Sequence, residues 1–305
     1  MSASRIFDTI NICISEAQSE SHQVQERALQ TLASITKVSP QNRTLLAQSD
    51  GAISTLAALT NAPIPIIQTL SLLILFNLSL NPDLKHSLAD METIYCLNSH
   101  ISLACSQDTC KLASSLICSL AMHDKNKAKF GVAGTVQLLV KAIIESSNDP
   151  DTHHLFSSLA ELVQFHGNCT LAVRSGAVPV LFRVVQSTDD EDLAATSLTI
   201  LGLLARFDEG LNGLKKTDGI MSSMLSVLKG RSLLSKEGAA DILLRLFEDS
   251  EGCVKEALAL PEFSTAIADL SVRGSVRVRE KVELIMRRMA EVSLASNVEP
   301  NSLYV

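Results

Sequence analysis

The chain has 305 residues, which is long enough for two ordinary domains or for one elongated repeat domain. A hydrophobic fraction of 46 % excludes wholesale disorder, and an aromatic fraction of 4 %, without tryptophan, favours closely stacked helices over a β-sandwich. The net charge of −7 argues against nucleic acid as a partner, because phosphate binding needs a basic surface.

The N-terminal segment, residues 1–22, is predicted to form one amphipathic helix. Ile6, Ile10, Ile14 and Ala17 recur at helical spacing, so they share one face. We expect this segment to act as an N-terminal capping helix.

The N-terminus also lacks the marks of a secreted or membrane-attached protein. It has no apolar signal-peptide core, and Ser2 stands where N-myristoylation needs glycine. The most apolar stretch, residues 70–80, is too short to span a bilayer. The seven cysteines are odd in number and contain no Cys-x-x-Cys pair, which favours free, mostly buried thiols in a reducing compartment. We expect a cytoplasmic protein, also present in the nucleus, without membrane insertion.

From residue 23 to residue 292 the sequence is periodic. Apolar or small residues at offsets 0, +4 and +7 recur every 42 or 43 residues, and the +4 and +7 positions are Leu, Ile or Met in every copy. These offsets lie on one face of a helix, so each copy is predicted to bury this stripe. The copies begin at Ala28, Ser71, Ala113, Leu155, Ser197, Ala239 and Val282.

The residues between the stripes repeat as well. A polar break follows each stripe, often with an asparagine and a base, as in Asn42-Arg43 and Asn126-Lys127. A short apolar segment comes next, then often a glycine suited to a left-handed turn, then an aliphatic run. Each unit therefore reads as a short helix, a sharp turn, a second helix, a polar loop and a long striped helix. The turn glycines are Gly51, Gly134, Gly176 and Gly219.

This period predicts an all-α solenoid, since one such unit cannot bury its own apolar face. A 34-residue two-helix repeat has the wrong period, whereas a two-helix HEAT repeat remains an alternative. The internal glycine break favours a three-helix armadillo unit, repeated about six times with incomplete N- and C-terminal units. The pattern ends after Met289, and residues 293–305 are expected to form a flexible C-terminal tail.

Four local motifs carry a family resemblance. Residues 42–53 and 168–178 are similar to the joint between armadillo repeats, and Leu75-Phe-Asn-Leu-Ser79 to a second armadillo motif. The stretch Arg273–Lys281 is similar to the end of the armadillo domains of plant U-box ubiquitin ligases. The resemblance implies a right-handed superhelical array. A U-box usually precedes such an array, and here the array begins too close to Met1 to leave room for one. The resemblance therefore implies the partner-binding half of such a ligase, without ligase activity.

In an armadillo array the striped helices line a concave groove, so offsets +2 and +6 are predicted to face a partner. The groove candidates are Gln30, Ser34, Leu73, Asn77, Ser115, Ser119, Ser157, Glu161, Thr199, Asp241, Arg245 and Arg288, together with Leu203 and Leu284. Nuclear-import adaptors of this family carry Trp at +2 and Asn at +6. Only Asn77 matches, so we hypothesise that the chain is not a receptor for basic localisation signals. The alternative is that the hydroxyl groups simply solvate an exposed face.

A basic run near the C-terminus has two interpretations. It could dock an acidic or phosphorylated segment through arginine, or it could be a charged capping face paired with Glu280, Glu283 and Glu291. We prefer the second interpretation. The run consists of Arg273, Arg277, Arg279, Lys281, Arg287 and Arg288.

Catalytic signatures are not evident. Glu161 lies two helical turns from His154, too far for the two to share one metal ion, and there is no nucleophile elbow, Walker loop or dinucleotide fingerprint. We expect no enzyme activity, no metal or other cofactor and no small-molecule substrate. The leading hypothesis is a scaffold or adaptor that binds an extended or helical protein segment. The alternative is a substrate-recognition component of a ubiquitin-ligase system, acting with a separate catalytic partner.

Overall fold

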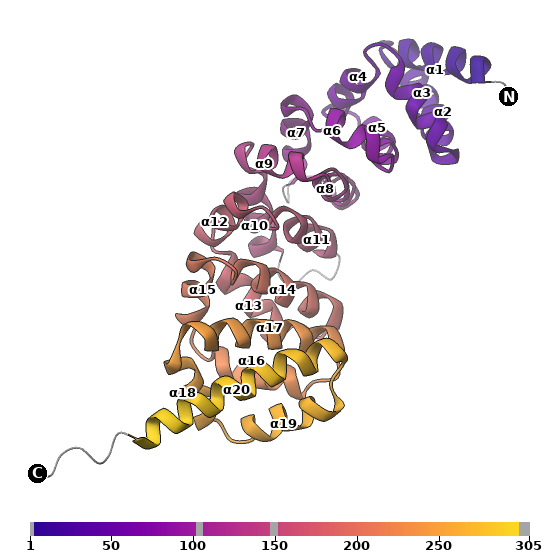
Figure 1. Ribbon diagram of the computed structural model, residues 1–305. Helices are drawn as coiled ribbons and strands as arrows, with labels where there is room; N and C mark the ends of the chain where they lie inside the picture. The colour runs from indigo at the N-terminus through magenta and orange to yellow at the C-terminus, as the bar shows by residue number, and fades with distance from the viewer. Residues whose placement is uncertain (1–2, 102–105, 147–151, 299–305) are drawn as a thin grey trace, which may run out of the picture. The chain divides into compact units, whose positions relative to one another are not determined.

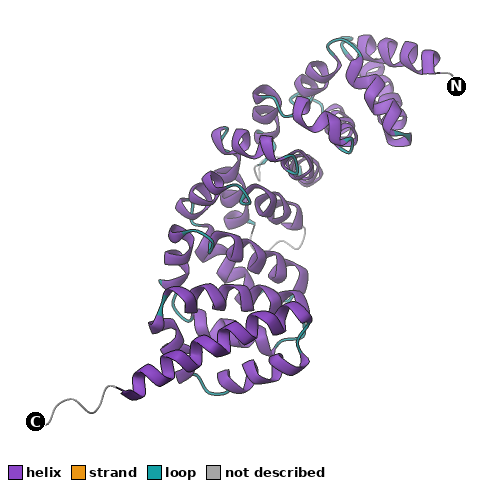
Figure 2. Ribbon diagram, in the orientation of Figure 1, coloured by secondary structure: helices purple, strands orange, loops and turns teal. Residues whose placement is uncertain are grey.

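The computed structural model describes residues 3–101, 106–146 and 152–298, and these residues contain helices and no strand (Figure 1, Figure 2). The predicted all-α class is confirmed. Clustering of contacts divides the chain into two compact units, residues 1–171 and 172–305, each of which is described by itself.

The first unit opens with helices α1 (Ala3–Ala17) and α2 (His22–Val38), which pack against each other. Three repeats follow, each made of a first helical segment, a second helix and a third helix. They are α3 (Pro40–Gln48), α4 (Ala52–Leu59) and α5 (Pro65–Ser79); η1 (Pro82–Leu84) with α6 (Lys85–Leu88), α7 (Met91–Asn98) and α8 (Gln107–Ala121); and α9 (Asp124–Val132), α10 (Thr135–Glu145) and α11 (His153–Leu162).

Helix α12 (His166–Arg174) spans the boundary between the units, and the second unit continues with the same three-helix plan. Its elements are α13 (Ala177–Ser187) and α14 (Glu191–Leu204); α15 (Asp208–Lys215), α16 (Ile220–Lys229) and α17 (Leu233–Asp249); and α18 (Glu251–Ala259), α19 (Phe263–Arg273) and α20 (Val276–Val298). The three-helix repeat is thus confirmed over the two-helix alternative.

The turn between the first and second helix of a repeat needs a left-handed residue, which explains the recurring glycine. Gly51, Gly134, Gly176 and Gly219 have φ values of 67°, 81°, 88° and 73°. In the last repeat Glu262 takes this place with a φ of 68°. In the repeat that lacks the glycine, Asp90 stays extended and caps α7 by accepting from the Thr93 amide at 2.8 Å. Local backbone chemistry therefore fixes where each second helix begins.

The predicted stripe forms the core along the third helices, where nearly all its members are buried. Ile35 is half-buried, and Met286 in α20 is 42 % exposed, so burial of Met286 was predicted wrongly. In α20 the buried residue is Ile285, one position earlier. The reason is that α20 packs on α17, α18 and α19, while no described helix covers the side that carries Met286. The other two members of this stripe, Val282 and Met289, are buried as predicted, so the difference is confined to the +4 position.

The segment boundaries differ in detail from the predicted ones. Helix α20 continues to Val298, past the boundary expected at residue 292, and residues 299–305 of the predicted tail lie outside the described residues. Among the described cysteines, Cys13, Cys169 and Cys253 are buried free thiols. No single helix in the described ranges is long and apolar enough to cross a membrane, although α5 with η1 and α6 passes as a pair bent by 110°.

Candidate protein-binding site

The candidate residues lie on the third helices, which pack side by side within each unit. In the first unit these helices are α2, α5, α8 and α11, and in the second they are α14, α17 and α20 (Figure 1). At about 100° per residue, offset +2 lies almost opposite the buried stripe, whereas offset +6 lies on its flank. The two offsets therefore differ in surroundings, which the repeat pattern alone does not reveal.

In the first unit, offset +2 gives the more accessible side chains. Gln30 and Ser157 are exposed, and Leu73 and Ser115 are half-buried. At offset +6, Ser34 on the first of these helices is exposed. Asn77 and Ser119, however, are each only 8 % exposed.

Offset +6 faces the preceding third helix. Asn77 Nδ2 donates to Thr36 Oγ1 on α2 at 3.1 Å. Ser119 Oγ donates to the carbonyl oxygen of Ser79 on α5 at 3.2 Å and accepts from Ser79 Oγ at 2.8 Å. These side chains therefore join neighbouring repeats. A peptide in the groove would reach Ser115 and Ser157 more readily than Asn77.

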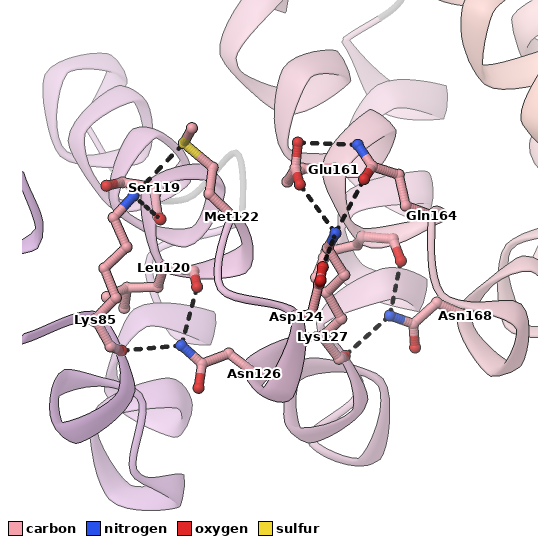
Figure 3. A network of polar contacts seen from close by, with 11 residues as sticks. Lys85, Ser119, Leu120, Met122, Asp124, Asn126, Lys127, Glu161, Gln164 and Asn168 are labelled. Carbon is pink, nitrogen blue, oxygen red and sulfur yellow. Dashed lines mark hydrogen bonds and ion pairs between the residues drawn. The ribbon is translucent and has the colours of Figure 1, made fainter. Parts of the chain in front are cut away.

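Two asparagines at the joints between repeats, Asn126 and Asn168, connect neighbouring helices through hydrogen bonds to backbone carbonyls (Figure 3). Asn126 Nδ2 donates to the carbonyl oxygens of Leu120 and Lys85, both at 2.9 Å. Asn168 Nδ2 makes the same pair of bonds one repeat later, to Leu162 at 3.0 Å and Lys127 at 2.9 Å. Each asparagine satisfies two carbonyls of the preceding repeat, one at the end of its third helix and one in its first helix.

Lys127, the base that follows Asn126, reaches the third helix of its own repeat. Lys127 Nζ lies 2.9 Å from Asp124 Oδ1, 3.1 Å from Glu161 Oε1 and 3.0 Å from Gln164 Oε1 (Figure 3). Glu161 also accepts from Gln164 Nε2 at 3.0 Å, so both of its oxygens are engaged. Burial alone would lower the pKa of Lys127, but Asp124 and Glu161 hold it above its ordinary value. Glu161 is therefore a structural partner of Lys127 as well as a groove candidate.

Lys85, at the position in its repeat that corresponds to Lys127, also contacts a third helix. Its Nζ donates to the carbonyl oxygen of Ser119 at 2.8 Å. Burial lowers the pKa of Lys85, although Cys118 and Glu161 oppose the shift. Burial, and then Glu161, raise the pKa of the Cys118 thiol. A thiol held protonated is a poor nucleophile, so this polar cluster has no evident catalytic cysteine.

In the second unit the candidates line a trough of about 490 Å³ between α14 and α17. The trough brings together Thr199, Leu203, Asp241 and Arg245, four predicted groove residues. It also includes residues that the repeat pattern did not select. These are Asp192, Ala195, Thr196, Leu198, Gly202, Arg206, Leu234, Glu237, Gly238 and Arg277. Arg206 was not predicted because it follows the end of α14, beyond offset +7 of the repeat. Its position four residues after Gly202 is the signal that could have indicated it.

Arg288 does not line the trough, and its guanidinium group already has hydrogen-bond partners. Arg288 Nε donates to the carbonyl oxygen of Phe247 at 3.1 Å, and Nη1 donates to Glu291 at 3.0 Å. Leu284 is 43 % exposed on the uncovered side of α20.

The C-terminal basic run is largely paired. Except for Arg279, each of its bases has a carboxylate partner within the described residues. The pairs are Arg273–Asp269 at 3.2 Å, Arg277–Glu237 at 3.4 Å, Lys281–Asp241 at 2.7 Å, Arg287–Glu283 at 3.9 Å and Arg288–Glu291 at 3.0 Å. Of the predicted partners, Glu283 and Glu291 form ion pairs and Glu280 does not within the described residues, while Asp269, Glu237 and Asp241 take the other bases.

No group of three or more His, Cys, Asp or Glu side chains in the described parts of the chain could hold a metal ion. His154 Nε2 lies 3.9 Å from Cys110 Sγ on the neighbouring third helix.

Comparison with known proteins places this geometry in context. No family profile matches the chain. A stretch of 116 residues, 38 % of the chain, is 29 % identical to U-box domain-containing protein 1 of Medicago truncatula, of which it covers only 17 %. The predicted similarity to a plant U-box protein is thus confirmed over part of the chain.

Solved structures match over much more of the chain. A computationally designed armadillo repeat protein for modular peptide recognition gives a TM-score of 0.70 at 16 % identity, covering 77 % of this chain and 99 % of that one. A β-catenin structure from work on its interaction with cadherin gives 0.80 at 13 % identity, covering 97 % of this chain and 56 % of the other. The three-helix repeats, their left-handed turns and these matches together show that the chain has the armadillo-repeat fold.

Proposed function

We propose that this protein is a non-catalytic scaffold or adaptor that binds segments of partner proteins on the exposed face of its third helices. The trough between α14 and α17 carries the proposal, because four residues predicted from the repeat register line one concave surface. Concave faces of helical repeats are a usual binding surface. Support also comes from the designed armadillo protein, whose stated purpose is modular peptide recognition.

The trough is suited to a peptide rather than to an enclosed small molecule. It is open and mixes polar and apolar lining, with Thr199 exposed and Leu203 half-buried. Small-molecule sites are typically enclosed and mostly apolar. An extended segment could place side chains along the two helices without being enclosed.

The test is selection of a displayed random-peptide library on the full chain. Thr199→Tyr would fill the trough without changing charge, and Ser157→Arg would obstruct the accessible face of the first unit. Ser226→Arg, on an exposed position of α16, is the matched control. We expect selected peptides to lose binding to at least one face variant and to keep binding to the control. Failure to select any binder, or equal binding to all four proteins, would contradict the proposal.

A second candidate function rests on the partial match to the Medicago U-box protein. The chain could present substrates to a separately encoded ubiquitin ligase. A reconstituted assay with activating and conjugating enzymes separates the possibilities. We expect no ubiquitin chains from this polypeptide alone; chains formed without any other ligase would refute the adaptor-only function.

A further inference from the structure

The trough between α14 and α17 has an uneven distribution of charge. Acidic side chains lie toward the first turns of the two helices, where Asp192 and Glu237 are found, and arginines lie toward their last turns. Acidic groups near helix N-termini and bases near C-termini suit the helix dipoles. The two ends therefore offer different surroundings to a bound segment.

Two of the three carboxylates that line the trough, Glu237 and Asp241, are already paired with cations. Lys281 Nζ lies 2.7 Å from Asp241 Oδ2 and 3.8 Å from Glu237 Oε1, and Arg277 Nη1 lies 3.4 Å from Glu237 Oε1. These contacts neutralise the carboxylates nearest the middle of the trough.

The basic end is not balanced. Within the described residues, neither the Arg206 nor the Arg245 guanidinium has an ion pair or hydrogen bond, and both line the trough. Arg288, at the same repeat offset as Arg245 in the next third helix, has both a carbonyl and a carboxylate partner. Arg245 thus departs from the pattern by which offset +6 binds the preceding helix.

The register of the two helices places the unpaired arginines at the same end of the trough. A Cβ added at Gly238 would lie 2.8 Å from Leu198 Cβ, and one added at Gly202 would lie 4.0 Å from Asp241 Cβ. Leu198 precedes Gly202 in α14, and their partners Gly238 and Asp241 follow each other in the same direction in α17. The two helices are therefore parallel. Arg245 lies one helical turn beyond Asp241 in α17, and Arg206 follows the C-terminal end of α14 shortly after Gly202, so both reach the same end of the trough. Two cations at one end of a trough repel each other, and an anion between them would remove that repulsion.

We infer that this trough binds an acidic extended segment of a partner protein. An Asp or Glu carboxylate of the segment is held between Arg206 and Arg245, and a neighbouring aliphatic side chain lies on Leu203, above Gly202. Leu203 is only half-buried in the trough, which leaves apolar surface for that contact. Arginine favours carboxylates because its planar donors can bind both oxygens. A basic segment would bring like charge to this end and bind less well.

This inference rests on the proposed function. The experiment gives one result if the inference is wrong and a different result if the proposed function is wrong. Peptides selected on the wild-type chain are titrated, as fluorescein-labelled synthetic peptides, against Arg206→Gln/Arg245→Gln. The matched control is Arg183→Gln/Arg231→Gln, which removes two exposed arginines that do not line the trough. Arg245→Lys keeps the positive charge but removes the planar guanidinium group, so its affinity shows which of the two the peptide needs. Circular dichroism melting checks that every variant folds.

We expect the selected peptides to be enriched in Asp or Glu next to an aliphatic residue. Affinity should fall at least about tenfold with the glutamine pair, stay within about twofold with the control, and weaken as salt is raised. Replacing the peptide's acidic residue by Gln should cause a similar loss. Peptides that lose binding to Thr199→Tyr but carry no acidic enrichment, or that bind the glutamine pair unchanged, would overturn the inference and leave the proposed function standing.

Discussion

Lys127 shows how a charged side chain is accommodated inside a helical repeat. Its side chain is 5 % exposed, and its three donors meet oxygens of Asp124, Glu161 and Gln164. Removing an ammonium group from water is costly, and these acceptors offset the cost. Because the acceptors lie on α9, on α11 and just after α11, Lys127 also fastens one third helix to the first helix of its own repeat.

Replacing this side chain should therefore weaken the first unit. We expect Lys127→Met to lower the free energy of unfolding by about 2–3 kcal/mol, since it leaves Glu161 without its cation. Lys125→Met, an exposed lysine on the same helix, should change it by less than about 0.5 kcal/mol. Urea unfolding measures both. In the double variant with Glu161→Gln the loss should be smaller than the sum of the single losses; a strictly additive result would argue against the ion pair.

The same residue gives a pH dependence with a defined sign. The folded-state pKa of Lys127 is above its ordinary value of 10.5, so folding favours the charged form. The stabilisation is fully present below that ordinary pKa and is lost as the pH rises through the folded-state pKa. The difference in unfolding free energy between wild type and Lys127→Met should stay constant from about pH 8 to 10 and narrow at higher pH. A difference that narrows already below pH 9 would be inconsistent with the raised pKa.

The sequence could indicate such a base but not its partners. The recurrence of Arg43, Lys85 and Lys127 after each polar break is visible in the printed residues. Glu161 lies in the next striped helix and Gln164 just after it, and only the folding of the repeat brings them to Lys127. For the same reason the burial of Asn77 and Ser119 was not predicted, because it depends on the neighbouring helix and not on their own.

At the scale of elements, the spacing between α14 and α17 depends on one small residue. At Gly238 an added Cβ would lie 2.8 Å from Leu198 Cβ, a contact too short for real side chains. At Gly202 the nearest atom to an added Cβ is 4.0 Å away, an ordinary contact. Both glycines are inside helices, so each also lacks helix propensity relative to alanine.

These two glycines should respond in opposite ways to alanine. We expect Gly238→Ala to destabilise by about 1–2 kcal/mol, because overpacking outweighs the gain in propensity. Gly202→Ala should stabilise by up to about 1 kcal/mol. Thermal unfolding measured side by side checks the order. If Gly238→Ala were the more stable variant, α14 and α17 would have to pack less closely than described.

The element pattern itself was accessible from the sequence for a clear physical reason. A stripe at offsets 0, +4 and +7 must be buried wherever a neighbour exists on both sides, and a glycine marks four of the left-handed turns in the described residues. The prediction failed at Met286, where α20 has neighbours on one side only. The trough was only partly predicted, since Gly202, Arg206 and Leu234 lie outside the offsets that were compared.

At the scale of the whole molecule, the repeats make mostly local contacts. Within each unit a third helix packs against the preceding and following third helices and against elements of its own and adjacent repeats. In such arrays stability is close to a sum of repeat terms and nearest-neighbour terms, so damage spreads only a short way. This differs from a globular domain, where one core couples all elements.

Hydrogen exchange should reveal this locality. In Lys127→Met, we expect faster amide exchange in α9 and α11, which carry the carboxylate partners of the lost ammonium group, and no change in α17 to α20, which belong to the second unit. Gly238→Ala should produce the complementary result, with faster exchange in α14 and α17 and none in α2 to α5. Mass spectrometry of exchanged peptides resolves these segments. If either substitution accelerated exchange uniformly along the chain, the units would be unfolding together, and the additive description of the repeats would have to be abandoned.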